Sequence, residues 1–600
     1  MKLKHNKRFK RDSQRAAFLS CVGFCGYGVM RKLGNGVGCP LTGRYIAHFN
    51  IEEKMINEKY VKDSLLRYNY FPLQKNKNEE LPSIFNSELL TPGIADKLCE
   101  ISLRSGGYDH CSYNVTRFNN VHRSLAIPHP LPYCHLVKEI ASNWDKLKHI
   151  ESNENSIIRP VAHPDGRIIV MTYEQSKKKT KRYHQCANGK KFVVHSDIAN
   201  FYPSIYTHSI PWALMGVQEA KKNQKGGFAN DLDRKQRMMK RNETTGIAIG
   251  PGTSNVISEI ILFEVDKLLS DKGYEFYRFI DDYTAFCSTY EQAESFVRDL
   301  SEYLSTYGLL LNIKKTEIKK LPKPTVADWV SDIGSRLSQR KKVNEYYCTR
   351  MLDYAVELQE KNPSGSILKY TIKSLINKAN NQAKLSLLEY VSNLTMHYPI
   401  LLPLLAKLLP YATKKQGDKY YQSLIFTLNE CIKNKNSDGM VWCLFYIRKY
   451  YDSGVGNELA ERIIATQDCM AILTLYLFDS HKNKVEKFAK EVSARALFDI
   501  DQYWILLYQL YFDRRIENPY KSHEKYLYLA KSKTEQQIKK QMENLSNHDA
   551  MVFDTLMQNK VTFINLVSLK QETRPRVTLF SKIMTKLSTK IVKKVEESAI

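Results

Sequence analysis

Two short apolar segments that run directly into aspartates constrain the fold of this chain more than any other feature. Phe192–Val194 leads to Asp197, and Tyr277–Ile280 leads to the adjacent pair Asp281–Asp282. Each segment has the length and apolar character of a buried strand, and Ser254–Leu269 between them repeats apolar residues at helical spacing. This order of strand, helix and strand predicts an α+β unit whose acidic side chains lie at strand ends.

The C-terminal part of the chain has a different pattern. Met351, Tyr354, Ala355 and Leu358 follow the spacing of an amphipathic helix, and similar segments with little glycine recur toward the C-terminus. A series of this kind predicts a stacked array of helices. The longest apolar run, Pro399–Pro410, is too short to span a bilayer and is expected to form a buried helix. We therefore expect no membrane partner.

Charge and cysteine content narrow the class of partner. The chain has 90 Lys and Arg against 63 Asp and Glu, a formal net charge of +27 and a pI near 9.3. This excess indicates a polyanion such as nucleic acid. The 12 cysteines are scattered without the spacing of a zinc site, so reduced thiols and a cytoplasmic location are expected. The basic N-terminal run resembles a secretory signal, but no cleavage site follows it, and an arm that binds phosphates is the better interpretation.

The aspartates are the residue type that metal-assisted nucleotidyl transfer requires. Joining a nucleotide to a 3′-hydroxyl needs one ion to acidify the attacking oxygen and a second to stabilise the leaving pyrophosphate. Mg²⁺ prefers hard oxygen ligands, which carboxylates supply. Two adjacent strands can bring Asp197 and Asp281 within reach of two ions about 4 Å apart. Acidic pairs are common on protein surfaces, so the order of the segments around Asp281–Asp282 matters more than the pair itself.

Two further segments accompany the aspartates. Gly246–Ser254 precedes a helix; its glycines permit close approach of the backbone to a nucleotide pair, and a helix N-terminus favours phosphate. Tyr307–Thr316 places Lys315 beyond an amphipathic helix, where its ammonium can neutralise or protonate departing pyrophosphate. Taken alone, the first segment is most simply a glycine turn and the second a solvated lysine. All four segments in this order favour a polymerase.

These four segments resemble motifs A, B, C and D of reverse transcriptases, over roughly residues 155–320. The resemblance implies a fingers–palm polymerase with two Mg²⁺ ions (Mn²⁺ is an alternative), deoxynucleoside triphosphates as substrates and DNA as product. The residues that it assigns are Asp197, Asp281 and Asp282 as metal ligands and catalytic acids, Lys315 as a further catalytic residue, Tyr202 as the gate against ribose, Gly250 and Ser254 at the nucleotide, and Gly246 and Phe279 at the nucleic acid.

The resemblance also covers the segment before motif A. Arg159–Arg167 resembles the fingers hairpin whose cations hold the triphosphate, so Arg167 first and Arg159 second are expected to bind the nucleotide. Phe279 replaces the usual tyrosine before the acidic pair, and Ala248 replaces a common proline in motif B. These departures fit bacterial lineages better than viral ones and leave the metal ligands unchanged.

Within reverse transcriptases, Asp197–Tyr202 together with Tyr206–Trp212 resembles bacterial abortive-infection and other defence-associated enzymes. That subgroup implies anti-phage defence, a helical repeat domain after the palm, and assembly as a homo-oligomer or with a partner polymerase. It also implies, in several members, priming from a protein hydroxyl with a covalent protein–DNA link, and in some no template; an RNA template or non-coding RNA partner is the alternative. Two rival interpretations stay open: a conventional RNA-templated enzyme of a retron or group II intron-like element, and an inactive RNA-binding scaffold.

The predicted fold is α+β, a reverse-transcriptase fingers–palm followed by an all-α helical-repeat C-terminal domain. Periodicity and resemblance together divide the chain into five segments. These are a basic N-terminal arm with a Gly-rich stretch (1–60), a fingers region (61–190), a palm with motifs A to D (191–325), a basic linker (326–345) and an α-helical repeat domain (346–600).

Overall fold

The structure of the chain is a computed structural model. It describes residues 56–72, 79–118, 120–171, 176–338, 340–363, 365–412, 417–521 and 535–569. The predicted basic arm and Gly-rich stretch (1–60) lies almost wholly outside these ranges. Ile56–Ile600 groups as one compact unit. One continuous hydrophobic core runs through the fingers, palm and helical segments of this unit, so these segments are not separate bodies.

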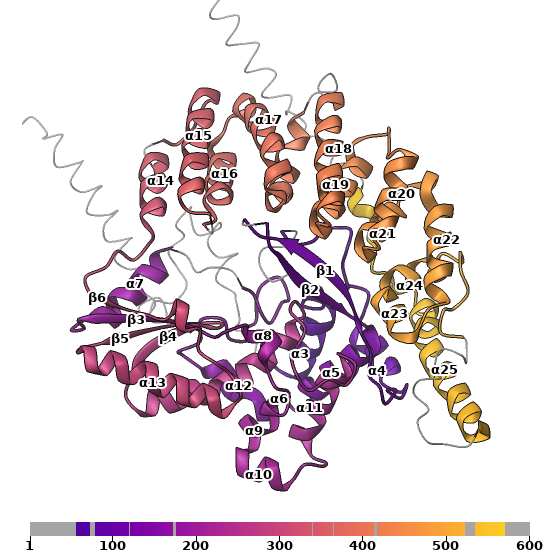
Figure 1. The fold of residues 1–600 in the computed structure, drawn as a ribbon, viewed down its shortest axis with the longest axis horizontal. Coiled ribbons are helices and arrows are strands. Elements are labelled where there is room, and N and C mark those ends of the chain that lie inside the picture. Colours follow the sequence, from indigo (N-terminus) through magenta and orange to yellow (C-terminus); the bar gives the residue numbers. More distant parts are fainter. Residues whose placement is uncertain are drawn as a thin grey trace, which may run out of the picture. The chain divides into compact units, whose positions relative to one another are not determined.

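A four-stranded antiparallel sheet carries the acidic residues. Its strands are β3 (Phe192–Asp197), β4 (Glu275–Phe279), β5 (Asp282–Cys287) and β6 (Glu317–Lys320), in the order β4-β5-β3-β6 (Figure 1). The two predicted strands are therefore present, as β3 and β4. Successive side chains of a strand point to opposite faces, and the adjacent residues Val193 and Val194 are both buried. Both faces of the sheet are therefore covered.

Helices cover the two faces. The long α12 (Gly252–Asp271) and α13 (Tyr290–Thr306) pack on the face that belongs to the main core, and α12 contains the predicted helix 254–269. On the other face, Tyr183 of α7 (Ser176–Ala187) packs against Val193 and Phe286. Smaller helices connect β3 to α12: α8 (Phe201–Ser204), α9 (Ser209–Met215), α10 (Val217–Lys222) and α11 (Phe228–Met238).

A hairpin and short helices precede the sheet. Strands β1 (His110–Thr116) and β2 (His122–Pro128) pair antiparallel over their whole length. The helices of this part are α3 (Glu58–Asp63), α4 (Pro92–Leu98), α5 (Pro130–Ser142) and α6 (Trp144–Leu147). The predicted hairpin at Arg159–Arg167 is only a turn: Val161 N donates to Ile168 O (2.9 Å) and His163 N donates to Arg167 O (3.0 Å), without a strand on either side.

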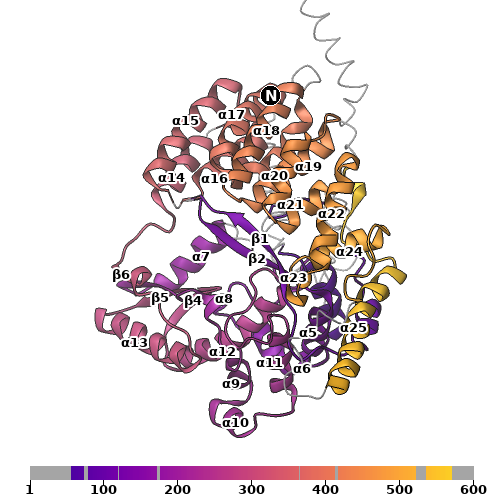
Figure 2. The same ribbon diagram turned by 45° about the vertical axis from the view of Figure 1, so that its right-hand side comes forward.

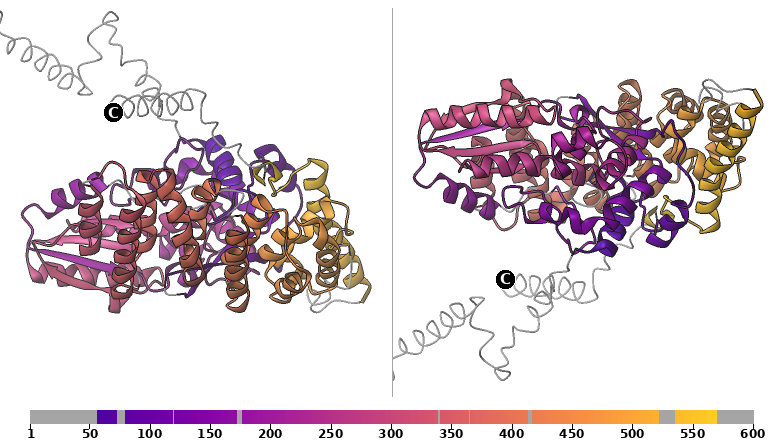
Figure 3. Two further views of the ribbon diagram at one scale, coloured as in Figure 1. Left: turned by 90° about the horizontal axis from the view of Figure 1, so that it is seen from above. Right: turned by 90° about the horizontal axis from the view of Figure 1, so that it is seen from below.

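The C-terminal part is all-α, as the periodicity predicts. Its helices follow one another in the order of the sequence, from the pink helices through orange to yellow (Figure 3). They are α14 (Asp328–Ser338), α15 (Glu345–Lys361), α16 (Ile367–Lys378), α17 (Asn381–His397), α18 (Gly417–Lys433), α19 (Ser437–Tyr450), α20 (Asn457–Ala465), α21 (Cys469–Leu475), α22 (Lys482–Ser493), α23 (Leu497–Gln502), α24 (Trp504–Phe512) and α25 (Glu535–Gln558). No helix among the described residues is long and apolar enough to cross a bilayer.

One segment differs from the expectation. The predicted linker 326–345 contains α14, because Trp329, Ile333 and Leu337 recur at helical spacing and the latter two are buried. The predicted buried helix at Pro399–Pro410 is present and largely buried, as 3₁₀ helices at Pro399–Lys407 and Leu409–Tyr411. Its internal proline, Pro403, lacks the backbone donor that a continuous α-helix needs.

The helical array meets the β1–β2 hairpin. In Figures 1 and 2 the two strands lie beside the orange helices, and α19 and α21 contact β1. Further along, the indole Nε1 of Trp504 in α24 donates to Ile127 O in β2 (3.2 Å). Residues more than three hundred positions apart in sequence are therefore in direct contact.

Candidate active site

Three aspartates converge at one end of the sheet. Asp197 is the last residue of β3, Asp282 is the first residue of β5, and the strand register pairs them directly. Asp281 lies in the turn between β4 and β5, where its carbonyl oxygen accepts a hydrogen bond from Ile198 N (3.3 Å). The structure thus brings Asp197 next to the pair Asp281–Asp282, although Asp197 and Asp282 are 85 residues apart in the sequence (282 − 197 = 85).

Ile280 gives this turn its conformation. Its φ of +61° is left-handed, which a β-branched residue adopts at a cost of roughly 1–2 kcal/mol. The carbonyl oxygen of Ile280 accepts a hydrogen bond from Nη1 of Arg278 (2.8 Å), a residue with 0% exposure. Arg278 is itself held by Glu259 (2.9 Å) and Asp266 (2.7 Å) of α12. The strained turn therefore rests on a buried ionic network anchored in the long helix.

The carboxylates repel one another. Burial, together with the charges of Asp282 and Asp197, raises the pKa of Asp281 to about 6. Burial and the charge of Asp197 also raise the pKa of Asp282, against the opposing charge of Lys315. A cation between them would relieve this repulsion, and oxygen ligands of this kind suit a hard divalent ion.

Lys315 and Asn312 both contact Asp197. Lys315 Nζ lies 2.6 Å from Asp197 Oδ2, and this contact raises the pKa of the lysine. The side-chain amide of Asn312 donates to the same oxygen (3.1 Å), while its backbone N–H donates to Asp197 O (2.7 Å). Sequence reasoning missed Asn312, although it lies within the segment that contains Lys315. With the side chains in these positions, no group of three or more His, Cys, Asp or Glu among the described residues is arranged to hold a metal ion.

The glycine-rich loop packs closely against the segment that follows β3 and against strand β2. Gly246 has φ +80°, and an added Cβ would lie 2.9 Å from Pro203 O. The close approach lets Ile247 N donate to Tyr202 O (3.0 Å). Gly250 has φ +132°, and an added Cβ would lie 3.1 Å from Ala126 O in β2. Both glycines therefore hold the loop against neighbouring backbone.

The remaining predicted residues of the palm lie around this loop. Tyr202 is buried, and its hydroxyl donates to Asn255 Oδ1 in the first turns of α12 (2.5 Å). The charge of Asp281 contributes to the raised pKa of Tyr202, so the two side chains interact. Ser254 is buried in the first turn of α12, and Phe279 is half-buried at the end of β4 opposite Asp282.

Two arginines outside the predicted pair interact electrostatically with Asp281. Arg159 donates to Asn153 O (3.0 Å), and Arg167 pairs with Asp165 (2.7 Å). In contrast, the charge of Arg123 lowers the pKa of Asp281, and the charge of Asp281 acts on Arg117.

Arg117 and Arg123 come from the end of the β1–β2 hairpin. Arg117 directly follows β1, and Arg123 is the second residue of β2. The only sequence signal for them is a pair of strand-length segments, 110–116 and 122–128, separated by a short turn flanked by basic residues. That pattern identifies a hairpin but not what the hairpin faces.

Comparison with known proteins agrees with this geometry. Residues 145–346 match the family model described as reverse transcriptase (RNA-dependent DNA polymerase). No curated protein matches the chain.

Solved telomerase structures align over much of the chain. Telomerase from Candida albicans with a TWJ fragment of telomeric RNA aligns at 12% identity and a TM-score of 0.25, covering 68% of this chain and 71% of that one. Apo telomerase from Candida tropicalis aligns at 11% identity and a TM-score of 0.27, covering 69% and 75%. These scores are too low to carry a functional conclusion. The family match covers the strands that hold all three aspartates, and the chain accordingly contains a reverse transcriptase domain and is a nucleotidyltransferase of the RNA-directed DNA polymerase type.

Proposed function

We propose that the chain is a Mg²⁺-dependent polymerase that extends DNA from deoxynucleoside triphosphates, with two ions bound by Asp197, Asp281 and Asp282. The observation that carries this proposal is the pairing of Asp197 with Asp282 across β3 and β5, with Asp281 in the adjoining turn. The raised pKa values of Asp281 and Asp282 support it, because clustered carboxylates that repel one another are suited to a cation. Mn²⁺ is the alternative ion.

The bound ions would supply Lewis-acid activation of the attacking hydroxyl and charge neutralisation at the leaving pyrophosphate. The protein's own groups complete the site. Arg117 and Arg123 are suited to the triphosphate, because guanidinium groups bind phosphate oxygens in pairs. Lys315 is 66% exposed at its side chain, so it can leave Asp197 and reach pyrophosphate. Tyr202 places a ring near Asp281, where it would exclude a ribose 2′-hydroxyl.

The finer features of the proposal come from the resemblance to defence-associated enzymes. They are a cytoplasmic role in anti-phage defence, priming from a protein hydroxyl with a covalent protein–DNA link, an absent or unusual template, and assembly as a homo-oligomer or with a partner polymerase. Conventional RNA-templated synthesis and an inactive RNA-binding scaffold are the competing functions. Each gives a different result in one assay.

The assay incubates purified full-length protein with Mg²⁺ and labelled deoxynucleotides, with and without added RNA. Incorporation that depends on Mg²⁺ supports the proposal, and label retained on denatured protein supports protein priming. Product that requires RNA supports the templated alternative. No product under any condition, including with Mn²⁺, would leave only the scaffold.

A double variant and a matched control assign the reaction to the aspartates. Asp281→Ala with Asp282→Ala should abolish incorporation without unfolding the protein, because both residues lie at the surface end of the sheet. Asp145→Ala is the control, since the Asp145 side chain is 89% exposed on a distant helix. Full activity in the double variant would refute the proposed site.

A further inference from the structure

The end of the β1–β2 hairpin is held by helix α19 of the array. Thr116, the last residue of β1, donates from its backbone N–H to Asp438 Oδ2 (2.9 Å) and from its hydroxyl to Asp438 Oδ1 (2.7 Å). The carboxylate also accepts a hydrogen bond from Gly439 N (2.8 Å). Thr116 is 0% and Asp438 4% exposed, so these hydrogen bonds do not compete with bulk water.

Strand β2 is held at the same end of the hairpin. His122, the first residue of β2, has its Nε2 atom 2.5 Å from Asn436 Oδ1, just before α19 begins. Thr116 and His122 are direct partners in the strand register. The N-terminal end of α19 therefore fixes both strands of the hairpin at the pair Thr116–His122.

This last pair adjoins the two cations of the candidate active site. Arg117 directly follows Thr116 in sequence, and Arg123 directly follows His122. The hairpin also packs on the glycine-rich loop of the candidate site, because Ala126 N in β2 donates to Ile249 O (2.8 Å) and a Cβ added to Gly250 would lie 3.1 Å from Ala126 O. Both arginines interact electrostatically with Asp281. A shift of the hairpin end would therefore move both arginines relative to the aspartates.

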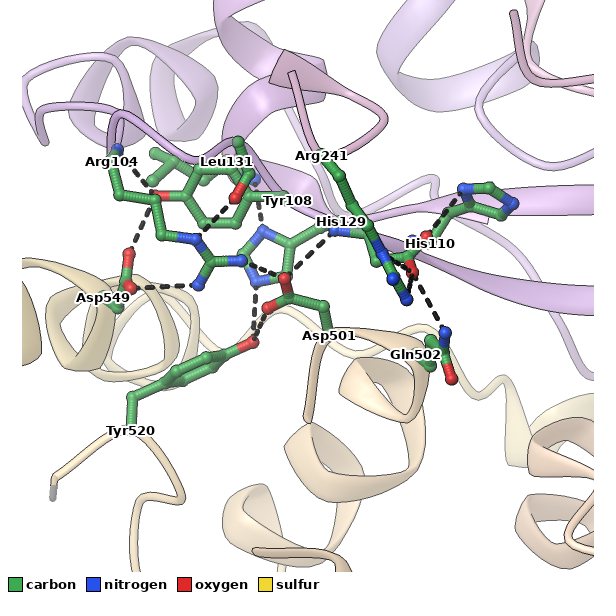
Figure 4. A network of polar contacts seen from close by, with 12 residues as sticks. Arg104, Tyr108, His110, His129, Leu131, Arg241, Asp501, Gln502, Tyr520 and Asp549 are labelled. Carbon is green, nitrogen blue, oxygen red and sulfur yellow. Dashed lines mark hydrogen bonds and ion pairs between the residues drawn. The ribbon is translucent and has the colours of Figure 1, made fainter. Parts of the chain in front are cut away.

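The other end of the hairpin is held by a second polar network. Asp501 accepts a hydrogen bond from Asp109 N (3.0 Å) and pairs with Arg104, while Asp549 pairs with Arg104 from another helix (3.1 Å) (Figure 4). Tyr520 completes the contact by donating to Asp501 (2.9 Å). With the base fixed in this way, the hydrogen bonds to Asp438 and Asn436 hold the end of the hairpin that carries Arg117 and Arg123.

Packing alone does not explain Asp438. A buried carboxylate is costly, and an apolar side chain would fill the same space without that cost. The three donors that surround Asp438 offset its burial, and two of them belong to Thr116. These directional hydrogen bonds form only when the hairpin end lies in one position, whereas an apolar contact would tolerate several positions.

We propose that Asp438 and Asn436 are positioning residues for the polymerase reaction. Through Thr116 and His122 they hold Arg117 and Arg123 where the two guanidinium groups meet the triphosphate of the incoming nucleotide. The helical array is in this way part of the nucleotide site. The inference rests on the proposed function, because it assigns the arginines to the triphosphate.

Two variants on different elements test this inference by steady-state kinetics. Thr116→Val removes one hydroxyl, keeps the shape of the side chain and leaves the backbone bond to Asp438 in place. Asp438→Asn keeps the volume and removes the charge. Each should raise KM for the deoxynucleotide roughly tenfold, with kcat changed less than about threefold, because the arginines bind the ground state and the aspartates are untouched.

Matched variants separate positioning from stability. Thr395→Val removes an equally buried hydroxyl, whose bond to Ser392 O (2.7 Å) lies within α17, and should leave KM unchanged. Arg117→Ala combined with Arg123→Ala should raise KM at least as much as Thr116→Val. Adding Thr116→Val to that double variant should raise KM no further, because both guanidinium groups through which Thr116 acts are then absent.

The outcomes are distinct. Unchanged KM in Thr116→Val and Asp438→Asn, in an active enzyme, would overturn the inference and leave the proposed function standing. A further rise in KM when Thr116→Val is added to the Arg117→Ala, Arg123→Ala protein would also overturn it, since Thr116 would then act independently of the two arginines. A wild-type protein that incorporates no nucleotide would overturn both.

Discussion

Replacing Asp281 with asparagine should stabilise the protein when no divalent ion is present. The charged form of Asp281 is disfavoured because its pKa is about 6 against an ordinary 3.8. At 1.36 kcal/mol per pKa unit the difference is roughly 3 kcal/mol, and screening by solvent at this partly exposed residue leaves about 1–2 kcal/mol. Asparagine keeps the shape of the side chain and removes the charge, so that repulsion is lost.

The pH dependence follows from the direction of the shift. A carboxyl whose folded pKa is raised destabilises the fold fully above about pH 6, and this penalty disappears as the pH falls through 6 toward 3.8. The advantage of Asp281→Asn should therefore be largest at pH 7–8 and absent near pH 4. Thermal unfolding in EDTA should show a midpoint higher by on the order of 1–2 °C at pH 7.5, given the size of the unit.

Mg²⁺ should reverse the order of the two proteins. An ion that binds only the folded state raises the unfolding midpoint by mass action, and the wild type retains the carboxylate that the variant lacks. Asp299→Asn is a useful control, because Asp299 is hydrogen-bonded to Tyr274 and its pKa is lowered, so its loss should lower the midpoint. If Asp281→Asn melts below the wild type in EDTA at pH 7.5, the three aspartates do not repel one another and the reasoning about their convergence is wrong.

Four further results are expected. Lys315→Ala should tighten Mg²⁺ binding by up to about fivefold, since an ion pair between Asp197 and the exposed Lys315 is worth at most about 1 kcal/mol. The same change should lower kcat about 100-fold or more if Lys315 protonates the leaving group; calorimetry and kinetics measure the two effects. Tyr202→Ala should raise ribonucleotide incorporation, whereas Tyr202→Phe, which keeps the ring and loses only the hydroxyl, should not. Equal sugar selectivity in all three proteins would contradict a gating role for Tyr202. Arg278→Met should destabilise the fold by about 3–5 kcal/mol, because Glu259 and Asp266 would be buried without an opposite charge, and an unchanged denaturation midpoint would contradict this. Affinity for polynucleotide should fall linearly with the logarithm of salt concentration, and a flat titration would mean that the positive charge serves another purpose.

Local patterns were sufficient to predict the strands and helices around the aspartates. Phe192–Val194 and Tyr277–Ile280 are apolar and short, and each one runs into the acidic residue that the sheet then pairs, so periodicity and motif spacing pointed the same way. The same agreement held for α12 and for the helices after residue 346. At Pro399–Pro410 the apolar run predicts a buried helix, which the structure contains; its 3₁₀ type follows from Pro403 inside the run.

Contacts between segments that are distant in the sequence could not be predicted from local patterns. Arg123 and Asp281 are separated by more than a hundred and fifty residues, and nothing local to Arg123 indicates a carboxylate partner. The same holds for Thr116 and Asp438, 322 positions apart. Arginines in a turn were expected at Arg159 and Arg167 because those residues fit the local pattern of a hairpin. The structure has its longer hairpin elsewhere, and only tertiary structure decides which hairpin faces the aspartates.

The turn at Ile280 depends on both local sequence and distant contacts. It combines a strained β-branched residue with carboxylates that repel one another, and neither feature is stable by itself. Glu259 and Asp266 on α12 break the rule that core positions of a helix are apolar, and they do so to hold Arg278, which in turn holds the Ile280 carbonyl. Apolar periodicity alone does not predict acids at these two buried positions of α12. They are the residues that keep an unfavourable turn, and the aspartate beside it, in position.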